Sequence, residues 1–272
     1  MIQDIYPRRL NNSFTDYKAS AEDELLLFDE KCRLLVKTDG GKIVFPHVSD
    51  AGDLRNVYLF SIDDTRYFFA LDETSFQKEG FSYNSPNELR ETCEEGEMLA
   101  VFTAYHLAKW YRDNRFCGRC GAPLELDKKE RALRCPKCGN LIFPRINPAV
   151  IVGVRNGDKI LITRYNRGFA HNALVAGFTE IGETLEETVA REVMEETGLK
   201  IKNISYYKSQ PWGSAQDVLM GFYCDVDGDT QIKRDDSELK YAEWVEREDI
   251  MLQPDSLSLT NEMMMMFKEG KF

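Results

Sequence analysis

Three glutamates near the middle of the chain have the spacing expected of divalent-metal chemistry. Glu192, Glu195 and Glu196 fall within one arc of a helix that turns about 100° per residue, and this arc adjoins the apolar direction of Val189 and Val193. Carboxylates crowded beside an apolar stripe repel one another and lose hydration, which favours a neutralising cation. Hard oxygen ligands suit Mg²⁺ or Mn²⁺, which also bind phosphate oxygens and activate water. The expected substrate is a phosphate ester or anhydride.

Local signals define the helix that must position these carboxylates. Thr184 and Glu187 form a capping box, and Gly198 stands where a left-handed cap ends a helix, which predicts a helix over 185–197. Glu186 and Glu187 point away from the three acids and are expected to be solvated.

The stretch from Gly177 to Leu199 resembles the Nudix box in every fixed position: Gly177, Glu183, and then REVMEETGL from Arg191 to Leu199. The resemblance implies hydrolysis of a nucleoside diphosphate linked to another moiety, with Glu192, Glu195 and Glu196 as metal ligands or base. It further implies that Arg191 and Glu183 hold the loop and helix together, with Glu183 also a candidate to support the metal shell and Gly177 and Gly198 structural.

Length and composition are those of a soluble globular protein of two modest domains. The net charge of −11 argues against broad binding of nucleic acid. No apolar run is long enough to cross a bilayer and the start lacks a secretory signal, so we expect a cytoplasmic protein with no membrane partner.

Four of the seven cysteines form two tight pairs. This spacing predicts a tetrahedral structural Zn²⁺ site in a zinc ribbon, with Gly121 and Gly139 in its tight turns. We interpret Cys32, Cys93 and Cys224 as inert thiols. The predicted zinc ligands are Cys117, Cys120, Cys135 and Cys138.

The segments around this ribbon suggest an α+β fold with four parts. A β-rich N-terminal domain over 1–95, with hairpin turns at Asp39-Gly40-Gly41 and Asp63-Asp64, precedes a connecting helix over 96–115. The ribbon occupies 116–143. A Nudix-type mixed sheet flanked by helices is predicted over 144–272, with a hairpin turn at Asn156-Gly157 and a closing helix whose methionines are core or dimer contacts.

The order of these parts, with FPRINPAVI before the Nudix box and SQPW after it, is similar to that of the zinc-ribbon Nudix hydrolases known as NADH pyrophosphatases. The resemblance covers nearly the whole chain. It implies a homodimer and makes Glu238 a further metal ligand or base, although alone this residue would be interpreted as a solvated acid. Residues expected near substrate are Phe143, Ala176, Gln210, Pro211, Trp212, Gly213, Ser214, Ala215, Gln216, Asp217 and Thr260.

Several of these positions depart from the family pattern. Gly213, Ser214 and Ala215 replace a proline, phenylalanine and proline, which removes an aromatic ring that can stack on a base. Phe143 stands where tyrosine is common, and Thr260 where alanine is expected. These changes leave the reaction type intact and open the choice of substrate.

The leading hypothesis is Mg²⁺- or Mn²⁺-dependent hydrolysis of NAD(H) to AMP and nicotinamide mononucleotide. Enzymatic alternatives are removal of NAD caps from RNA, supported by basic residues in the ribbon, and hydrolysis of ADP-ribose or diadenosine polyphosphates. A ligand sensor on a Nudix scaffold and a zinc-stabilised scaffold are the non-enzymatic alternatives, and the complete carboxylate set argues against both.

Overall fold

The computed structural model describes residues 1–72, 76–166 and 171–272, and the chain divides into two compact units. Unit 1 comprises Met1–Gln3, Ile146–Trp212 and Asp217–Phe272, and unit 2 comprises Asp4–Arg145 and Gly213–Gln216. Unit 1 therefore takes in the first three residues of the sequence, and unit 2 takes in a short hairpin loop from the second half. Among the described residues, no helix is both long and apolar enough to span a membrane.

Unit 1 is built on a mixed sheet in the order β14-β15-β11-β12-β16, with β13 paired to β11. Strands β11 and β15 run parallel, whereas the β14–β15, β11–β12, β11–β13 and β12–β16 pairs are antiparallel. The strands are β11 (Asn147–Asn156), β12 (Lys159–Tyr165), β13 (Val175–Phe178), β14 (Ile201–Trp212), β15 (Asp217–Val226) and β16 (Leu239–Glu246).

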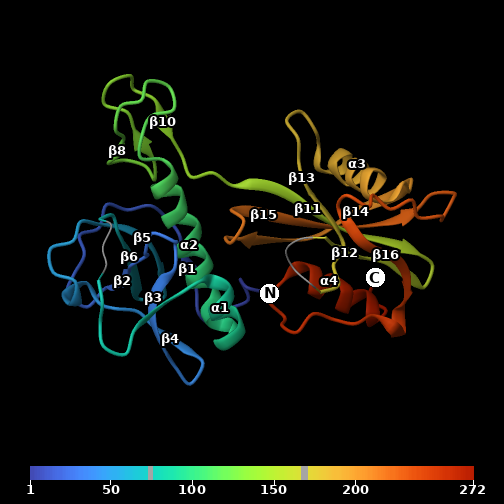
Figure 1. Cartoon of the computed structure of the whole chain (residues 1–272), viewed down its shortest axis with the longest axis horizontal. Helices are drawn as coiled ribbons and strands as arrows, with labels where there is room; N and C mark the ends of the chain where they lie inside the picture. The colour runs from blue at the N-terminus through green and yellow to red at the C-terminus, as the bar shows by residue number, and fades with distance from the viewer. Residues whose placement is uncertain (73–75, 167–170) are drawn as a thin grey trace. The chain divides into compact units, whose positions relative to one another are not determined.

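Helices α3 (Leu185–Thr197) and α4 (Leu259–Lys268) cover opposite faces of this sheet (Figure 1). Alternation along β11 explains the two layers: Ala149 and Ile151 pack with α4, whereas Val150 and Val152 pack with α3. A short 3-10 helix, η3 (Arg247–Asp249), precedes α4, and the α4 residues Met263 and Met264 are core residues. The predicted mixed sheet with flanking helices is confirmed.

The turn between β11 and β12 lies one residue later than predicted. Asn156 pairs with Lys159, so the two loop residues are Gly157 and Asp158, and of these only Gly157 has positive φ. A positive φ at the first central residue alone fits a type II′ turn better than the expected type I′ turn. The hairpin itself is confirmed.

Unit 2 is β-rich up to its long helix. One sheet has the order β1-β5-β6-β2 and another β4-β3-β7, and the hairpins at Gly40-Gly41 and Asp63-Asp64 are confirmed. The strands are β1 (Leu10–Asn11), β2 (Glu24–Leu26), β3 (Leu34–Asp39), β4 (Lys42–Val44), β5 (Asn56–Ile62), β6 (Thr65–Ala70) and β7 (Ser82–Asn84), with η1 (Val48–Asp50) between β4 and β5.

Two helices and the ribbon complete unit 2. Helix α1 (Pro86–Thr92) and the 3-10 segment η2 (Glu95–Glu97) precede α2 (Met98–Asp113), in which Trp110 is buried. The ribbon strands β8 (Glu125–Leu126), β9 (Leu133–Arg134) and β10 (Leu141–Ile142) pair in the order β10-β9-β8. A helix is thus observed at Met98–Asp113, inside the range 96–115 where one was expected, and Trp110 is buried in it.

Candidate functional site

Helix α3 forms as its cap signals predict. The Thr184 hydroxyl accepts a hydrogen bond from the Glu187 N–H at 3.2 Å, and the Glu187 carboxylate accepts one from the Thr184 N–H at 2.7 Å. Gly198 ends the helix with φ +69°, in the left-handed region. Val189 and Val193 are fully buried and fix the rotation of the helix about its axis, so the acidic arc lies beside the apolar face.

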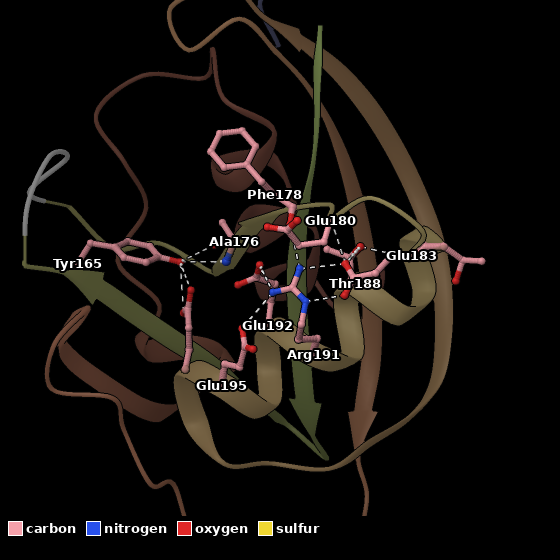
Figure 2. A network of polar contacts seen from close by, with 11 residues as sticks. Tyr165, Ala176, Phe178, Glu180, Glu183, Thr188, Arg191, Glu192 and Glu195 are labelled. Atoms are coloured by element: carbon pink, nitrogen blue, oxygen red, sulfur yellow. Dashed lines mark hydrogen bonds and ion pairs between the residues drawn. The ribbon is translucent and has the colours of Figure 1, made fainter.

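Arg191 joins the loop to the helix (Figure 2). Its Nε and Nη2 donate to the two Glu183 oxygens at 2.6 and 3.0 Å, and its Nη2 also donates to the Phe178 carbonyl oxygen at 2.9 Å. Hydrogen bonds from Arg191, the Glu180 N–H and the Thr188 hydroxyl hold the pKa of Glu183 near 2. Both Glu183 oxygens accept hydrogen bonds from Arg191, and this pair of bonds fixes the loop against the helix.

Arg191 also holds two of the candidate metal ligands. Its Nη1 donates to Glu192 Oε1 at 2.7 Å and to Glu195 Oε2 at 3.0 Å. The Glu192 carboxyl lies directly on Gly177, where an added Cβ would stand 1.9 Å from the carboxyl carbon. Gly177 is therefore required for close approach of β13 to α3. Burial raises the pKa of Glu192, and repulsion from Glu195 and Glu238 adds to this effect.

Glu196 occupies a separate and deeper position. It is only 2% exposed, and the Tyr165 hydroxyl donates to it at 3.0 Å while accepting from the Ala176 N–H at 2.9 Å. Burial raises the pKa of Glu196 to about 8, and the neighbouring charges of Glu192 and Glu238 contribute. Tyr165, which no pattern in the sequence singled out, thus contacts both Glu196 and the Ala176 backbone.

The four candidate carboxylates influence one another without forming a tight cluster. Within 1–72, 76–166 and 171–272, no three carboxylates bring oxygens within 4.8 Å of one another. Glu238 acts on Glu192 and Glu196 through its charge, and Glu195 is mostly exposed, at 59%. The oxygen donors, their mutual repulsion and their partial burial are the conditions that bound Mg²⁺ or Mn²⁺ relieves. The residues present therefore fit a divalent cation.

The four ribbon cysteines form a compact ligand group. Their Sγ atoms all lie within 4.8 Å of one another, with 3.5 Å between Cys120 and Cys135 and 3.7 Å between Cys117 and Cys138. Backbone N–H groups of Arg119 and Cys120 lower the pKa of Cys117 to about 6, which favours the thiolate that zinc binds. The donor set fits a structural Zn²⁺ ion.

Strand β14 ends in three residues that were predicted to lie near substrate, and their environments differ. Gln210 is fully buried: its Nε2 donates to the Leu257 carbonyl at 2.7 Å and to Gln3 Oε1 at 3.3 Å, and its Oε1 accepts from the Leu259 N–H. Pro211 is exposed, and Trp212 packs partly against the core beneath α4. The side-chain amide of Gln210 therefore forms its hydrogen bonds within the protein.

The four-residue loop that follows belongs to unit 2. An added Cβ at Gly213 would lie 2.1 Å from the Phe102 carbonyl oxygen, so the proline of the family pattern has no room here. Gln216 is buried with φ +62°, and its Oε1 accepts from Arg145 at 2.7 Å. Ser214 is half-buried and Ala215 is exposed.

Phe143 and Gln216 line the same cavity within unit 2. Its volume is about 300 Å³, and Trp110, Asp113, Asn114, Ile142 and Arg145 complete the described lining. In unit 1, Asp217 is 5% exposed with an Asn147 contact at 3.5 Å, and Thr260 is half-buried in the first turn of α4. The predicted substrate residues are therefore divided between the two units.

Phe178 is a candidate that the sequence reasoning missed. It ends β13, two residues after Ala176, and its side chain is 53% exposed. Figure 2 shows the ring projecting away from the Arg191 network. The signal available in the sequence was an aromatic residue directly after Gly177, because aromatic rings can stack on a base.

Two regions of the chain match known families. Residues 145–264 match the NUDIX domain, and residues 112–143 match the NADH pyrophosphatase zinc ribbon domain. Residues 112–264 thus contain a match to the NADH pyrophosphatase zinc ribbon domain followed directly by a match to the NUDIX domain.

Its relatives include the NAD-capped RNA hydrolase NudC of Klebsiella pneumoniae subsp. pneumoniae, which is 43% identical over 54% of this chain and 58% of that protein. NudC of Salmonella typhimurium (strain LT2) is 43% identical over 59% of this chain and 63% of that protein. The matches thus span less than two thirds of the length of these relatives. A solved Nudix hydrolase from Nitrosomonas europaea is similar with a TM-score of 0.48 and 19% identity, over 58% of this chain and 92% of that one.

Proposed function

We propose that this protein is a metal-dependent hydrolase of the pyrophosphate in NAD(H), with AMP and nicotinamide mononucleotide as products. The observation that carries the proposal is the arrangement around α3, where Arg191 holds Glu192 and Glu195 while Glu196 is held by Tyr165. Relatives named NAD-capped RNA hydrolase support a substrate that contains the pyrophosphate of NAD, which free NAD(H) and NAD-capped RNA share.

The chemistry requires a water oxygen to bond to one phosphorus while the bridging oxygen leaves with the other phosphate. Mg²⁺ or Mn²⁺, when bound, neutralises the phosphates and lowers the pKa of a water molecule. Glu192, Glu195, Glu196 and Glu238 are the proposed ligands, and one of them takes the proton of the attacking water. Arg191 and Glu183 keep the loop on the helix, so in this proposal they act as positioning residues.

The base of the substrate requires a stacking partner other than the missing family phenylalanine. Phe178, Trp212 and Phe143 are the aromatic residues at the proposed positions, and Phe178 and Phe143 are exposed. We propose that Phe178 and Trp212, both in unit 1, supply the base stacking that Gly213, Ser214 and Ala215 cannot provide.

Removal of NAD caps from RNA is the second candidate, because it is the activity in the names of the relatives. The basic ribbon gives it less support than its sequence suggests. Arg131 donates to the Leu59 and Asn12 carbonyl oxygens, and Arg134 pairs with Asp127 at 2.7 Å. Lys128, Lys129 and Lys137 are exposed, and so is Arg134, whose charge is already paired with Asp127.

The test is turnover of NADH, NAD⁺, ADP-ribose, diadenosine tetraphosphate and NAD-capped RNA with Mg²⁺ or Mn²⁺, with AMP or decapped RNA measured by chromatography. Glu195→Gln is expected to lower kcat by about 10²- to 10⁴-fold. The exposed helix residue Glu186 supplies the control, Glu186→Gln, which should retain activity. A preference for ADP-ribose or the polyphosphate would overturn the substrate, and absence of all turnover would favour the ligand sensor.

Assembly and location are proposed on the resemblance alone. We expect a homodimer, to be checked by light scattering of the purified chain, and a cytoplasmic location, to be checked by fractionation.

A further inference from the structure

The first three residues of the sequence are part of unit 1, whereas the residues that follow them directly in the chain belong to unit 2. Ile2 is 1% exposed, and its N–H donates to the Leu257 carbonyl oxygen at 3.0 Å. Met1 packs against the core cluster that includes Met263 and Met264. This segment is therefore bound against the start of α4.

Gln3 connects the segment to the end of β14. Its Nε2 donates to the Ser209 carbonyl oxygen at 3.1 Å, and its Oε1 accepts from Gln210 Nε2 at 3.3 Å. The same Gln210 amide reaches the start of α4, where it contacts Leu257 and Leu259 at 2.7 Å each. Three segments distant in sequence thus meet at one pair of glutamine amides.

A buried polar network supports the α4 side of this junction. The Ser258 hydroxyl caps α4 by accepting from the Asn261 N–H at 3.1 Å, and it donates to Gln253 Oε1 at 2.6 Å. Gln253 in turn donates from its backbone to Asn261 Oδ1 and from Nε2 to the Asn172 carbonyl oxygen. Buried polar groups that are satisfied in this way hold one geometry, because breaking any bond leaves an unpaired group.

We propose that Gln3 and Gln210 are positioning residues, whose paired amides lock the end of β14, carrying Trp212, to the start of α4, carrying Thr260. Gln210 then serves substrate binding through the protein and not by direct contact, because both its amide hydrogens and its carbonyl oxygen are engaged. This inference rests on the proposed function, since Trp212 and Thr260 are substrate residues only in that proposal.

The test compares Gln3→Ala with Gln231→Ala, a matched change at an exposed glutamine. Gln3→Ala removes two hydrogen bonds at the junction, so KM for NADH is expected to rise about three- to tenfold while kcat changes less than about twofold. The dissociation constant of AMP, measured by calorimetry, should rise by a similar factor. Hydrogen exchange should become faster at residues 209–212 and 257–261, and Gln231→Ala should leave all of these values unchanged.

A double-mutant cycle with Gln210→Ala gives a second criterion, because two residues acting through one junction have non-additive effects. Additive effects, or faster exchange with unchanged KM and AMP affinity, would overturn the positioning role. Unchanged exchange in Gln3→Ala would overturn it as well. If the wild-type protein hydrolyses no dinucleotide, the proposed function is wrong. The positioning role of Gln3 and Gln210 is then still tested by the dissociation constant of AMP and by the hydrogen-exchange rates. Failure of AMP to bind the wild-type protein would overturn the inference too.

Discussion

The zinc ribbon and the α3 site both gather anionic ligands, but they do so by different means. In the ribbon, each pair of cysteines flanks a tight turn, and all four sulfur atoms lie within 4.8 Å of one another. At the α3 site, hydrogen bonds from Arg191 and Tyr165 position the carboxylates, and Gly177 leaves room for Glu192 because it has no side chain. The ribbon should therefore be most sensitive to loss of its own ligands, and the α3 site should also be sensitive to its supporting residues.

The largest expected effect is the loss of zinc from a ribbon that lacks one ligand. Cys135→Ser should reduce bound zinc from about one per chain to almost none, because so small a segment depends on the metal to fold. Elemental analysis of the purified protein measures this, and hydrogen exchange over 112–143 should become fast. Cys93→Ser, at a thiol outside the ribbon, should keep its zinc. Full zinc occupancy in Cys135→Ser would contradict the four-cysteine site.

At the α3 site, a single methyl group should have a large effect on catalysis. The Cβ of Gly177→Ala would lie 1.9 Å from the Glu192 carboxyl carbon, so this carboxylate must move. A displacement of about 1 Å in a reacting group costs on the order of 100-fold in rate, which kcat/KM for NADH would show. The ribbon supplies the control: Gly118 has no atom within 4 Å of an added Cβ, and Gly118→Ala should be neutral. Equal activity of both variants would remove Glu192 from the proposed site.

The same contrast explains what the sequence could predict. Helix α3 and the cysteine pairs depend on signals within a few residues, such as Thr184 with Glu187, and both predictions were confirmed. The contacts of Gln210 with Gln3 and of Glu196 with Tyr165 join segments far apart in the chain, and they follow from strand register and packing that no local pattern encodes. The position of the 213–216 loop in unit 2 has the same cause, because Gly213 approaches the backbone of α2.

A smaller effect is expected from changing the arginine that supports the α3 site. Arg191→Lys keeps the charge but loses the planar fork that contacts Glu183 through two nitrogens. The unfolding temperature should fall by roughly 3–8 °C in calorimetry. Arg55 makes a similar pair with Asp72 at the surface, where its side chain is 76% exposed. Arg55→Lys should change the unfolding temperature by less than about 2 °C, and equal shifts would show that the Arg191 tie contributes no special stability.

The smallest predicted effect concerns Asp217, a carboxylate that forms no ion pair with a lysine or arginine among the described residues. Burial raises the pKa of Asp217 from 3.8 to about 6, and the side-chain hydrogen bond from Asn147 opposes this rise only in part. The folded state therefore favours the neutral acid: the stabilisation is complete below about pH 4 and is lost as the pH rises through about 6. Solvent screens part of this effect, so the loss is at most about 2 kcal/mol. Asp217→Asn cannot titrate, so urea unfolding from about pH 4 to about pH 7 should show the wild-type protein losing stability relative to this variant, whereas Asp229→Asn, at an exposed position, should follow the wild-type curve. If the free energies of unfolding of the wild-type protein and Asp217→Asn change with pH in the same way, the Asp217 carboxyl is solvated. Its pKa would then not be raised by burial, and Asp217 would not differ in this way from the acids that Arg191 binds.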